Sequence, residues 1–276
     1  MKMAITPLAR TLNIWQAQGD PIAEIRITHA RGSTPRETGA CLLVTPTEIH
    51  GTIGGGRLES DAIDNARRLL RGENILENHE ISLGPSINQC CGGHVSLSIT
   101  RLDAAGIEAL RAEDAKSYAA RPTILLFGAG HVGRAMAAAF SLLPFRQIWI
   151  DSRAQEFGPI PPNTEPRITT DWQSELAQAP PGSAVLILTH SHTLDALILE
   201  AALHRTDLAY LGLIGSKSKR KRFESALIAS GISEDRARSF TCPIGANPTG
   251  DKRPEIIAAF AVTEVAGCFL RPTSRK

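Results

Sequence analysis

The sequence predicts an α/β protein of two domains, the second of which contains a parallel sheet. At 276 residues the chain is long enough to bury two hydrophobic cores. Its second half alternates short apolar runs with helical stretches, which is typical of a parallel sheet with helices on both faces. The Arg121-Pro122 pair marks the boundary, because the residue before a proline is pushed out of helical geometry. We therefore expect an N-terminal α+β domain over residues 1–120 and a second domain over 121–276.

The N-terminal domain begins with a predicted helix. Leu8, Leu12 and Trp15 lie near helical spacing, and Gly19 ends the pattern. Alternating apolar residues then predict strands, and three glycine-rich loops separate them, at 32–39, 54–56 and 84–94. In chain order we expect a helix at 7–18, strands at 22–28, 40–45 and 49–53, a helix at 57–71, strands at 75–83 and 95–102, and a helix at 105–119.

The C-terminal domain is predicted from the alternation of apolar runs and helices. The expected strands are 123–127, 147–151, 167–170, 184–189 and 209–214, and the expected helices are 131–143, 172–178, 193–204, 216–229 and 254–267. A proline-rich segment, 159–166, is predicted to be a surface connection.

A glycine motif identifies the type of parallel sheet. Gly128, Gly130 and Gly133 follow the first strand at GxGxxG spacing and open the next helix. The first glycine permits the tight turn, the second lets the backbone approach a pyrophosphate, and the third lets helix and strand pack closely. Asp151 stands 18 residues past Gly133, where an acidic side chain would meet a ribose hydroxyl pair. This order predicts a Rossmann-type fold for the C-terminal domain.

Composition excludes several classes of partner. Lysine and arginine number 30 against 28 aspartate and glutamate, so no overall field favours nucleic acid or a membrane surface. The first residues lack the apolar core of a signal peptide, and no stretch has the length of a membrane span, so we expect a cytoplasmic protein. The five cysteines form no CxxC pair, which argues against a zinc cluster or a disulfide framework.

Two adjacent cysteines carry the clearest chemical signal of the N-terminal domain. Cys90 and Cys91 precede Gly92 and Gly93, which let the loop adopt unusual conformations and present both thiols. Exposed thiols in a reducing compartment suit sulfur transfer, contact with a soft metal, or a redox step. Cysteine is also a small apolar residue that packs well, so burial in a core is the alternative.

The other loops of this domain are candidates for binding an oxyanion. Gly54, Gly55 and Gly56 precede a helix, where free amides can wrap an anion, although such clusters also occur simply as turns. Ser33 and Arg36 in the preceding loop add a hydroxyl and a guanidinium, which favours an oxyanion ligand.

Two further motifs lie in the C-terminal domain. His190 and His192 follow a predicted strand, at the edge where parallel sheets bind ligands, and we expect hydrogen bonding to a ligand or a strand-end cap rather than zinc. Five basic residues fall within 217–222 at the start of a helix, where the dipole is already positive. That placement makes sense if an anion compensates it; a solvated surface helix is the alternative.

Seven motifs in order resemble the XdhC/CoxI family, the XdhC-type accessory proteins of xanthine dehydrogenase. They are GSTPR (32–36), GTIGGGRLE (51–59), QCCGG (89–93), GAGHVG (128–133), THSHTLD (189–195), GLIGSKSKR (212–220) and CPIG (242–245). The resemblance covers nearly the full length. Two positions depart from the family pattern. Ile87-Asn88 would alter the flexibility of the loop beside the cysteines, and Asp251 places a carboxylate near any anion bound at the C-terminal turn.

The resemblance implies an assembly factor rather than an enzyme. Such a protein binds the molybdenum cofactor, supports its sulfuration with a cysteine desulfurase, and inserts it into the molybdenum subunit of xanthine dehydrogenase; we also expect a homodimer. Cys90 and Cys91 are then candidates for contact with sulfur or molybdenum, and Ser33, Arg36 and the loop 54–56 would hold anionic oxygens. The Rossmann-type domain would hold a nucleotide or the pterin.

An NAD(P)-dependent oxidoreductase is the rival interpretation. Asp151 would favour NAD by repelling a 2′-phosphate, although Arg153 weakens that preference. Only His131, His190 and His192 are placed to act as acid or base beside a nicotinamide. A third interpretation is that the Rossmann-type domain is a vestigial scaffold and that the protein only docks partners.

Overall fold

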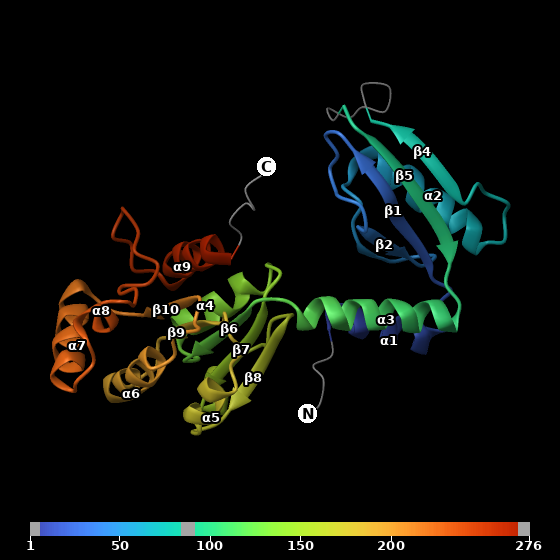
Figure 1. Cartoon of the computed structure of the whole chain (residues 1–276). Helices are drawn as coiled ribbons and strands as arrows, with labels where there is room; N and C mark the ends of the chain where they lie inside the picture. Colours follow the sequence, from blue (N-terminus) through green and yellow to red (C-terminus); the bar gives the residue numbers. More distant parts are fainter. Residues whose placement is uncertain (1–5, 84–91, 270–276) are drawn as a thin grey trace. The chain divides into compact units, whose positions relative to one another are not determined.

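The computed structural model describes residues 6–83 and 92–269 and divides the chain into two compact units (Figure 1). Unit 1 comprises Met1–Lys116 and unit 2 comprises Ser117–Lys276. The division falls four residues before the 120/121 boundary that the sequence predicts, within the last turn of helix α3 (Ala104–Ala119). Among the described residues, no helix is long and apolar enough to cross a membrane.

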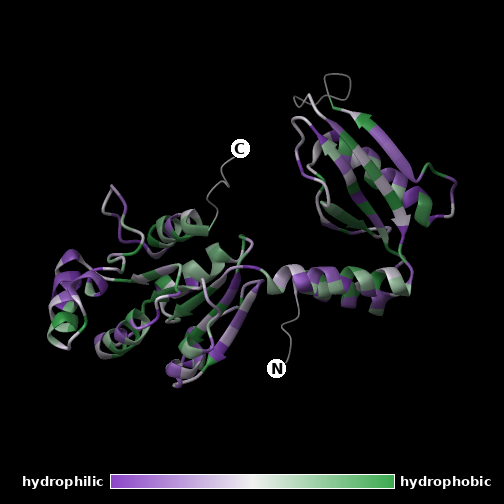
Figure 2. Cartoon of the chain, viewed as in Figure 1, coloured by the Kyte–Doolittle hydropathy of each residue, from purple (hydrophilic) through white to green (hydrophobic). Residues whose placement is uncertain are grey.

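Unit 1 is an antiparallel sheet with helices. Its elements are α1 (Pro7–Gln18), β1 (Ala23–Arg31), β2 (Cys41–Val44), β3 (Ile49–Gly51), α2 (Gly56–Leu70), β4 (Asn78–Ser82), β5 (His94–Arg101) and α3. The strand order is β3-β2-β1-β5-β4, and every neighbouring pair is antiparallel. The edge strand β4 is mostly hydrophilic (Figure 2), as expected for a strand with one open side.

The core of unit 1 lies on both faces of this sheet. Ile25 and Ile27 of β1 pack with Leu58 and other residues of α2 on one face. On the other face a smaller cluster joins Trp15 of α1 to Leu43 of β2 and to α3. The alternation of buried side chains that predicts the strands therefore also separates these two clusters.

Unit 2 is a parallel sheet between two layers of helices, which confirms the predicted Rossmann-type fold. Its strands are β6 (Thr123–Phe127), β7 (Arg146–Asp151), β8 (Thr164–Ile168), β9 (Ala184–Ile187) and β10 (Tyr210–Leu213). Its helices are α4 (His131–Phe140), α5 (Trp172–Ala177), α6 (His192–Leu203), α7 (Lys217–Ala229), α8 (Glu234–Ala237) and α9 (Pro254–Phe269), with a 3₁₀ turn η2 at Ala154–Glu156. The strand order is β10-β9-β6-β7-β8, so the order reverses at β6.

Each face of this sheet has its own core. Leu125 and Phe127 of β6 face α5, α6 and α7, whereas Ile124 and Leu126 face α4 and α9. All four side chains are at most 1 % exposed. Strands buried on both faces explain why the sequence shows continuous apolar runs here rather than alternation.

The structure corrects the third strand of unit 2 and adds two short elements. We expect a strand at 167–170 after a proline-rich connection, but β8 begins at Thr164 and includes Pro166. A proline is accepted because β8 is an edge strand, which uses only part of its amide groups. Helix α8 and the turn η2 are too short to produce a periodic pattern, so the sequence does not predict them.

Candidate functional site

The glycine loop of unit 2 lies at the point where the strand order reverses, and two of its glycines are required by the fold. A Cβ atom on Gly128 would lie 2.2 Å from the carbonyl oxygen of Leu188. A Cβ atom on Gly133 would lie 2.1 Å from the carbonyl oxygen of Gly128. These two residues therefore permit the close packing of strand, loop and helix α4.

Gly130 differs from the other two glycines of the motif. A Cβ atom built there meets nothing within 4 Å, and the residue has the ordinary φ of −68°. It is the N-cap residue of α4, and no side chain caps that end of the helix. The first amides of a helix have no partner within it, and open space beside such a helix end is typical of a phosphate site. His131, the next residue, has an exposed side chain.

Asp151 is buried at the end of β7 and holds the glycine loop. One carboxylate oxygen accepts a hydrogen bond of 2.8 Å from the amide of Ala129, and both oxygens accept bonds from Arg153. Burial alone would raise the pKa of Asp151, but the bonds from Arg153 and from the Ala129 amide outweigh it and lower that pKa. The sequence predicts that this side chain binds a ribose; in this structure one of its oxygens bonds to the glycine loop and both bond to Arg153.

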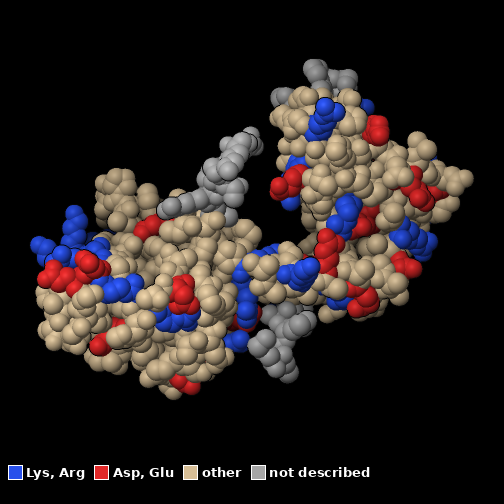
Figure 3. All heavy atoms as spheres, viewed as in Figure 1, with Lys and Arg blue, Asp and Glu red and all other residues tan. Residues whose placement is uncertain are grey.

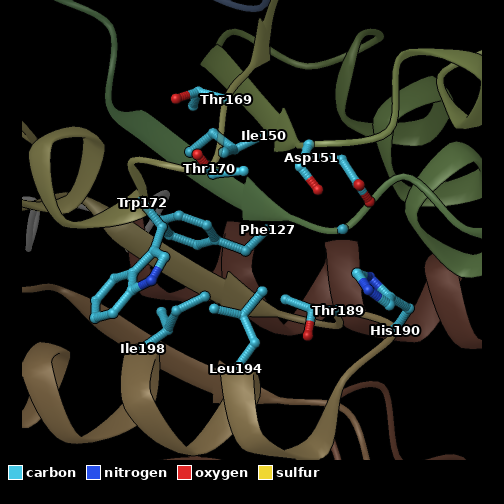
Figure 4. Close-up of a pocket in the computed structure, with 12 residues that line it drawn as sticks. Phe127, Ile150, Asp151, Thr169, Thr170, Trp172, Thr189, His190, Leu194 and Ile198 are labelled. Carbon is cyan, nitrogen blue, oxygen red and sulfur yellow. The ribbon is translucent and has the colours of Figure 1, made fainter.

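A slot of about 210 Å³ opens beside Asp151 (Figure 4). Phe127, Ile150 and Trp172 form much of its apolar wall, and Leu194 and Ile198 come from α6. Hydroxyl-bearing side chains and a histidine complete the lining: Ser152, Thr169, Thr170, Thr189 and His190. An apolar wall with a few polar groups suits a flat ring system. The sequence gives no signal for Trp172 beyond its place at the start of the helix predicted after the third strand.

A larger cleft of about 750 Å³ lies at the ends of β9 and β10. Its lining includes His190 and His192, together with Lys219, Arg222 and Lys252. Thr189 and His190 line both this cleft and the slot. The structure therefore brings the predicted histidines together with part of the predicted basic run. In the described part of the chain, no group of three or more potential ligands could hold a metal ion.

A buried ion pair supports the wall of this cleft. The Nζ of Lys219 lies 2.8 Å from a carboxylate oxygen of Asp195, and the two side chains are only 11 % and 2 % exposed. The other oxygen of Asp195 accepts bonds from the amide and the hydroxyl of Thr189. Because the pair links α6, α7 and the end of β9, it fixes the positions of these three segments. The sequence shows both residues but not their pairing.

Unit 1 brings the predicted loops together at one end of its sheet. A Cβ atom on Gly93 would lie 2.4 Å from the carbonyl oxygen of Ser33, and one on Gly54 would lie 2.6 Å from the Pro35 side chain. The loops at 32–36, 54–56 and 92–93 are thus in contact. Cys90 and Cys91 lie outside the described residues.

The triple glycine of unit 1 already surrounds a carboxylate of the chain. Gly54, Gly55 and Gly56 all have positive φ, of 122°, 76° and 66°, which favours glycine at each position. One oxygen of Glu59 accepts bonds from the amides of Ile53 and Gly55 and from the hydroxyl of Thr52. Burial would raise the pKa of Glu59, but these bonds lower it. The anion at this turn is therefore Glu59 in this structure.

Arg36 remains available beside this turn. Its side chain is exposed, and it has no hydrogen bond or ion pair with any residue in 6–83 or 92–269. Ser33 is also exposed. Arg26 of the same unit, in contrast, pairs with Glu24 and Glu113. Arg36 is therefore the described group of these loops best suited to an external anion.

Comparison with known families agrees with this architecture. Residues 124–265 match the model described as the XdhC Rossmann domain, and residues 15–79 match the model of the XdhC and CoxI family. The chain therefore belongs to the XdhC and CoxI family, as its motifs indicate.

The proteins that are similar to this chain include a curated relative and a solved structure. One is YqeB of Escherichia coli K12, an uncharacterized protein, which is 29% identical over 257 residues. The match spans 91% of this chain but only 44% of YqeB, so this chain corresponds to less than half of that relative. The other is a crystal structure described as a xanthine dehydrogenase from Bacillus halodurans, with a TM-score of 0.74, 18% identity and 98% of each chain covered. At that identity the likeness establishes the fold alone.

Proposed function

We propose that this protein is an accessory factor that binds the molybdenum cofactor, supports its sulfuration and inserts it into xanthine dehydrogenase. The observation that carries the proposal is the meeting of the loops 32–36, 54–56 and 92–93 at one end of unit 1. The last of these loops directly follows Cys90 and Cys91 in the chain. Membership of the XdhC and CoxI family supports the same role.

The described residues fit one part of the cofactor. Molybdopterin carries a phosphate, and the exposed guanidinium of Arg36 can bind a phosphate through two parallel hydrogen bonds. When bound, the cofactor would supply the redox-active metal and its dithiolene. The thiolates of Cys90 and Cys91 are soft ligands of the kind that contact such a metal or carry sulfur. The role implies a cysteine desulfurase and the molybdenum subunit of xanthine dehydrogenase as partners.

Anaerobic purification from a host that makes molybdopterin tests this proposal. The wild-type protein should retain pterin, measured by fluorescence after oxidation, and Arg36→Gln should retain about tenfold less because the phosphate loses its charged partner. Arg71→Gln is the matched control, since Arg71 lies at the opposite end of α2 from these loops. Absence of pterin from the wild type, even after purified cofactor is added, would contradict the proposal.

The cysteine pair is tested separately. Cys90→Ala with Cys91→Ala should lower the activity of the partner dehydrogenase in cells, because neither methyl group can replace a thiolate ligand. The melting temperature of the variant should stay near that of the wild type. Full partner activity in the double variant would show that these thiols take no part in the mechanism. A large fall in melting temperature would indicate instead that the two cysteines pack in a core.

Nucleotide binding by unit 2 is a second candidate, favoured by the open space at Gly130. An NAD(P)-dependent oxidoreductase would use this site, with His131, His190 or His192 as acid or base. All three side chains are exposed, which gives little protection from water. Gly130→Val should abolish the binding of NAD(H) or NADP(H) in calorimetry while the protein stays folded. Gly128→Val should unfold unit 2 instead, and equal binding heats for Gly130→Val and the wild type would show that the motif is only structural.

A further inference from the structure

A cavity in unit 1 lies between helix α2 and the edge strand β4. It has a volume of about 270 Å³, and its apolar wall is formed by Leu58, Ala62, Ile81, Leu97 and Ile99. Helix α2 packs chiefly on β1 and β5, which are neighbours within the sheet. The sheet extends one strand further, to β4 (Figure 1), so the helix covers that strand only in part and space remains between them.

His79 stands where the strand pattern predicts an apolar side chain. Along β4, His79 and Ile81 point to the covered face and line the cavity, whereas the residues between and beside them are exposed. The Nε2 atom of His79 is buried, and it has no hydrogen-bond partner among residues 6–83 and 92–269. A buried polar atom without a partner destabilises the folded state, so an apolar residue would suit this position better if packing alone decided it.

The size of the cavity and its polar atom indicate a single substituted ring. Apolar cavities of roughly 150 Å³ hold benzene, and sites for drug-sized ligands measure about 300–1,000 Å³. At about 270 Å³, this cavity suits one aromatic ring with small substituents rather than a large cofactor. A hydroxyl both donates and accepts, so a hydroxyl on the ring would pair with Nε2 in either tautomer of the imidazole.

The charges around the cavity favour an uncharged ligand. Among the described residues that line it, only Asp61 has an ionised side chain when His79 is neutral. The carboxylate of Asp61 is 60% exposed and lies 3.4 Å from the guanidinium of Arg57. It would repel an anion, and its pairing with Arg57 leaves little attraction for a cation. Charged side chains of both signs are interspersed on the face of unit 1 that Figure 3 shows, so no region of one sign gathers there to attract a charged ligand.

We propose that this cavity binds a small uncharged phenol, with the aromatic ring between α2 and the strands β4 and β5 and the hydroxyl hydrogen-bonded to Nε2 of His79. The side-chain amide of Asn65 lines the same cavity and offers N–H donors to a second polar substituent. The proposal goes beyond the accessory role, and it uses no residue of the loops at 32–36, 54–56 and 92–93.

Titration of the whole chain with p-cresol and with toluene, followed by protein NMR, tests the proposal, because the two rings differ only in the hydroxyl. The wild type should bind p-cresol about tenfold more tightly than toluene, since toluene leaves the buried nitrogen unpaired. His79→Leu should remove this difference. It should also raise the melting temperature of unit 1 in the absence of ligand, because the unpaired polar atom is gone.

Two further variants locate the binding. Ala62→Phe, or the smaller Ala62→Leu if the first variant does not fold, should abolish the binding of both rings by filling the cavity. His29→Leu is the matched control, because His29 is an exposed histidine of β1 outside the lining, and this variant should bind both rings as the wild type does.

Three results would overturn the proposal. The first is a wild type that binds neither ring, or binds p-cresol no better than toluene. The second is p-cresol binding that survives in a folded variant with the cavity filled at Ala62, since the ring would then lie elsewhere. The third is a lower melting temperature for His79→Leu, which would show that the histidine has a structural role.

Discussion

At the scale of single residues, the glycine turns at 54–56 and 128–133 are each stabilised by a carboxylate from the chain itself. Glu59 accepts bonds from the amides of Ile53 and Gly55, and Asp151 accepts a bond from the amide of Ala129. Both carboxylates have a pKa below the usual value because these bonds favour the charged form despite burial. A glycine cluster therefore identifies an anion-binding turn without specifying that the anion is a ligand.

We expect Glu59→Gln to destabilise unit 1 by roughly 1 kcal/mol, since the partly exposed carboxylate caps the turn before α2. Because the folded-state pKa is lowered, this stabilisation is present above the ordinary pKa of 4.5 and is lost as pH falls through the folded value. The free energies of unfolding of the variant and the wild type, measured with urea, should therefore differ at neutral pH and become equal in acid. Asp61→Asn, which removes an exposed carboxylate from the same helix, should change little. A difference that persists unchanged in acid would contradict the role of the charge.

At the scale of elements, the ion pair of Lys219 with Asp195 joins α7 to α6. The carboxylate is also bonded to Thr189 at the end of β9, so one buried group positions three segments around the cleft. A sequence separation of 24 residues between the partners makes this a tertiary interaction. The shape of the cleft therefore depends on this pair.

Lys219→Met should destabilise unit 2 by about 3 kcal/mol, because it leaves the carboxylate of Asp195 buried without its cation. Lys217→Met is the control, since Lys217 is an exposed cation at the start of the same helix. The free energy of unfolding of each variant is measured by urea denaturation. The double variant Lys219→Met with Asp195→Leu should recover part of the stability that Lys219→Met loses. Equal midpoints for Lys219→Met and Lys217→Met would show that the pair contributes nothing to stability.

At the scale of the whole molecule, the two units have separate hydrophobic cores. Ile25 belongs to the cluster between the antiparallel sheet and α2, and Leu186 belongs to the cluster between the parallel sheet, α4 and α9. Both side chains are fully buried. A unit with its own core unfolds cooperatively by itself.

Calorimetric unfolding should therefore show two transitions. Ile25→Ala should lower the temperature of one transition and Leu186→Ala that of the other, because each substitution leaves a cavity in one core. Each shift should correspond to a loss of about 2–5 kcal/mol in the free energy of unfolding of that unit. Each variant serves as the control for the other. A single transition that both substitutions lower equally would indicate that the chain unfolds as one cooperative body.

The sequence by itself determined the order and type of the main elements, the Rossmann-type fold and the family. These follow from local patterns: apolar periodicity, the glycine spacing of the motif beginning at Gly128, and short motifs along the chain. Only the tertiary structure decided that Glu59 and Asp151 fill the glycine turns, that Lys219 pairs with Asp195, and that Trp172 and Lys252 line two adjoining cavities. The physical reason is that a hydrogen bond, an ion pair or a cavity wall depends on distances between segments far apart in the chain, and local periodicity does not specify those distances.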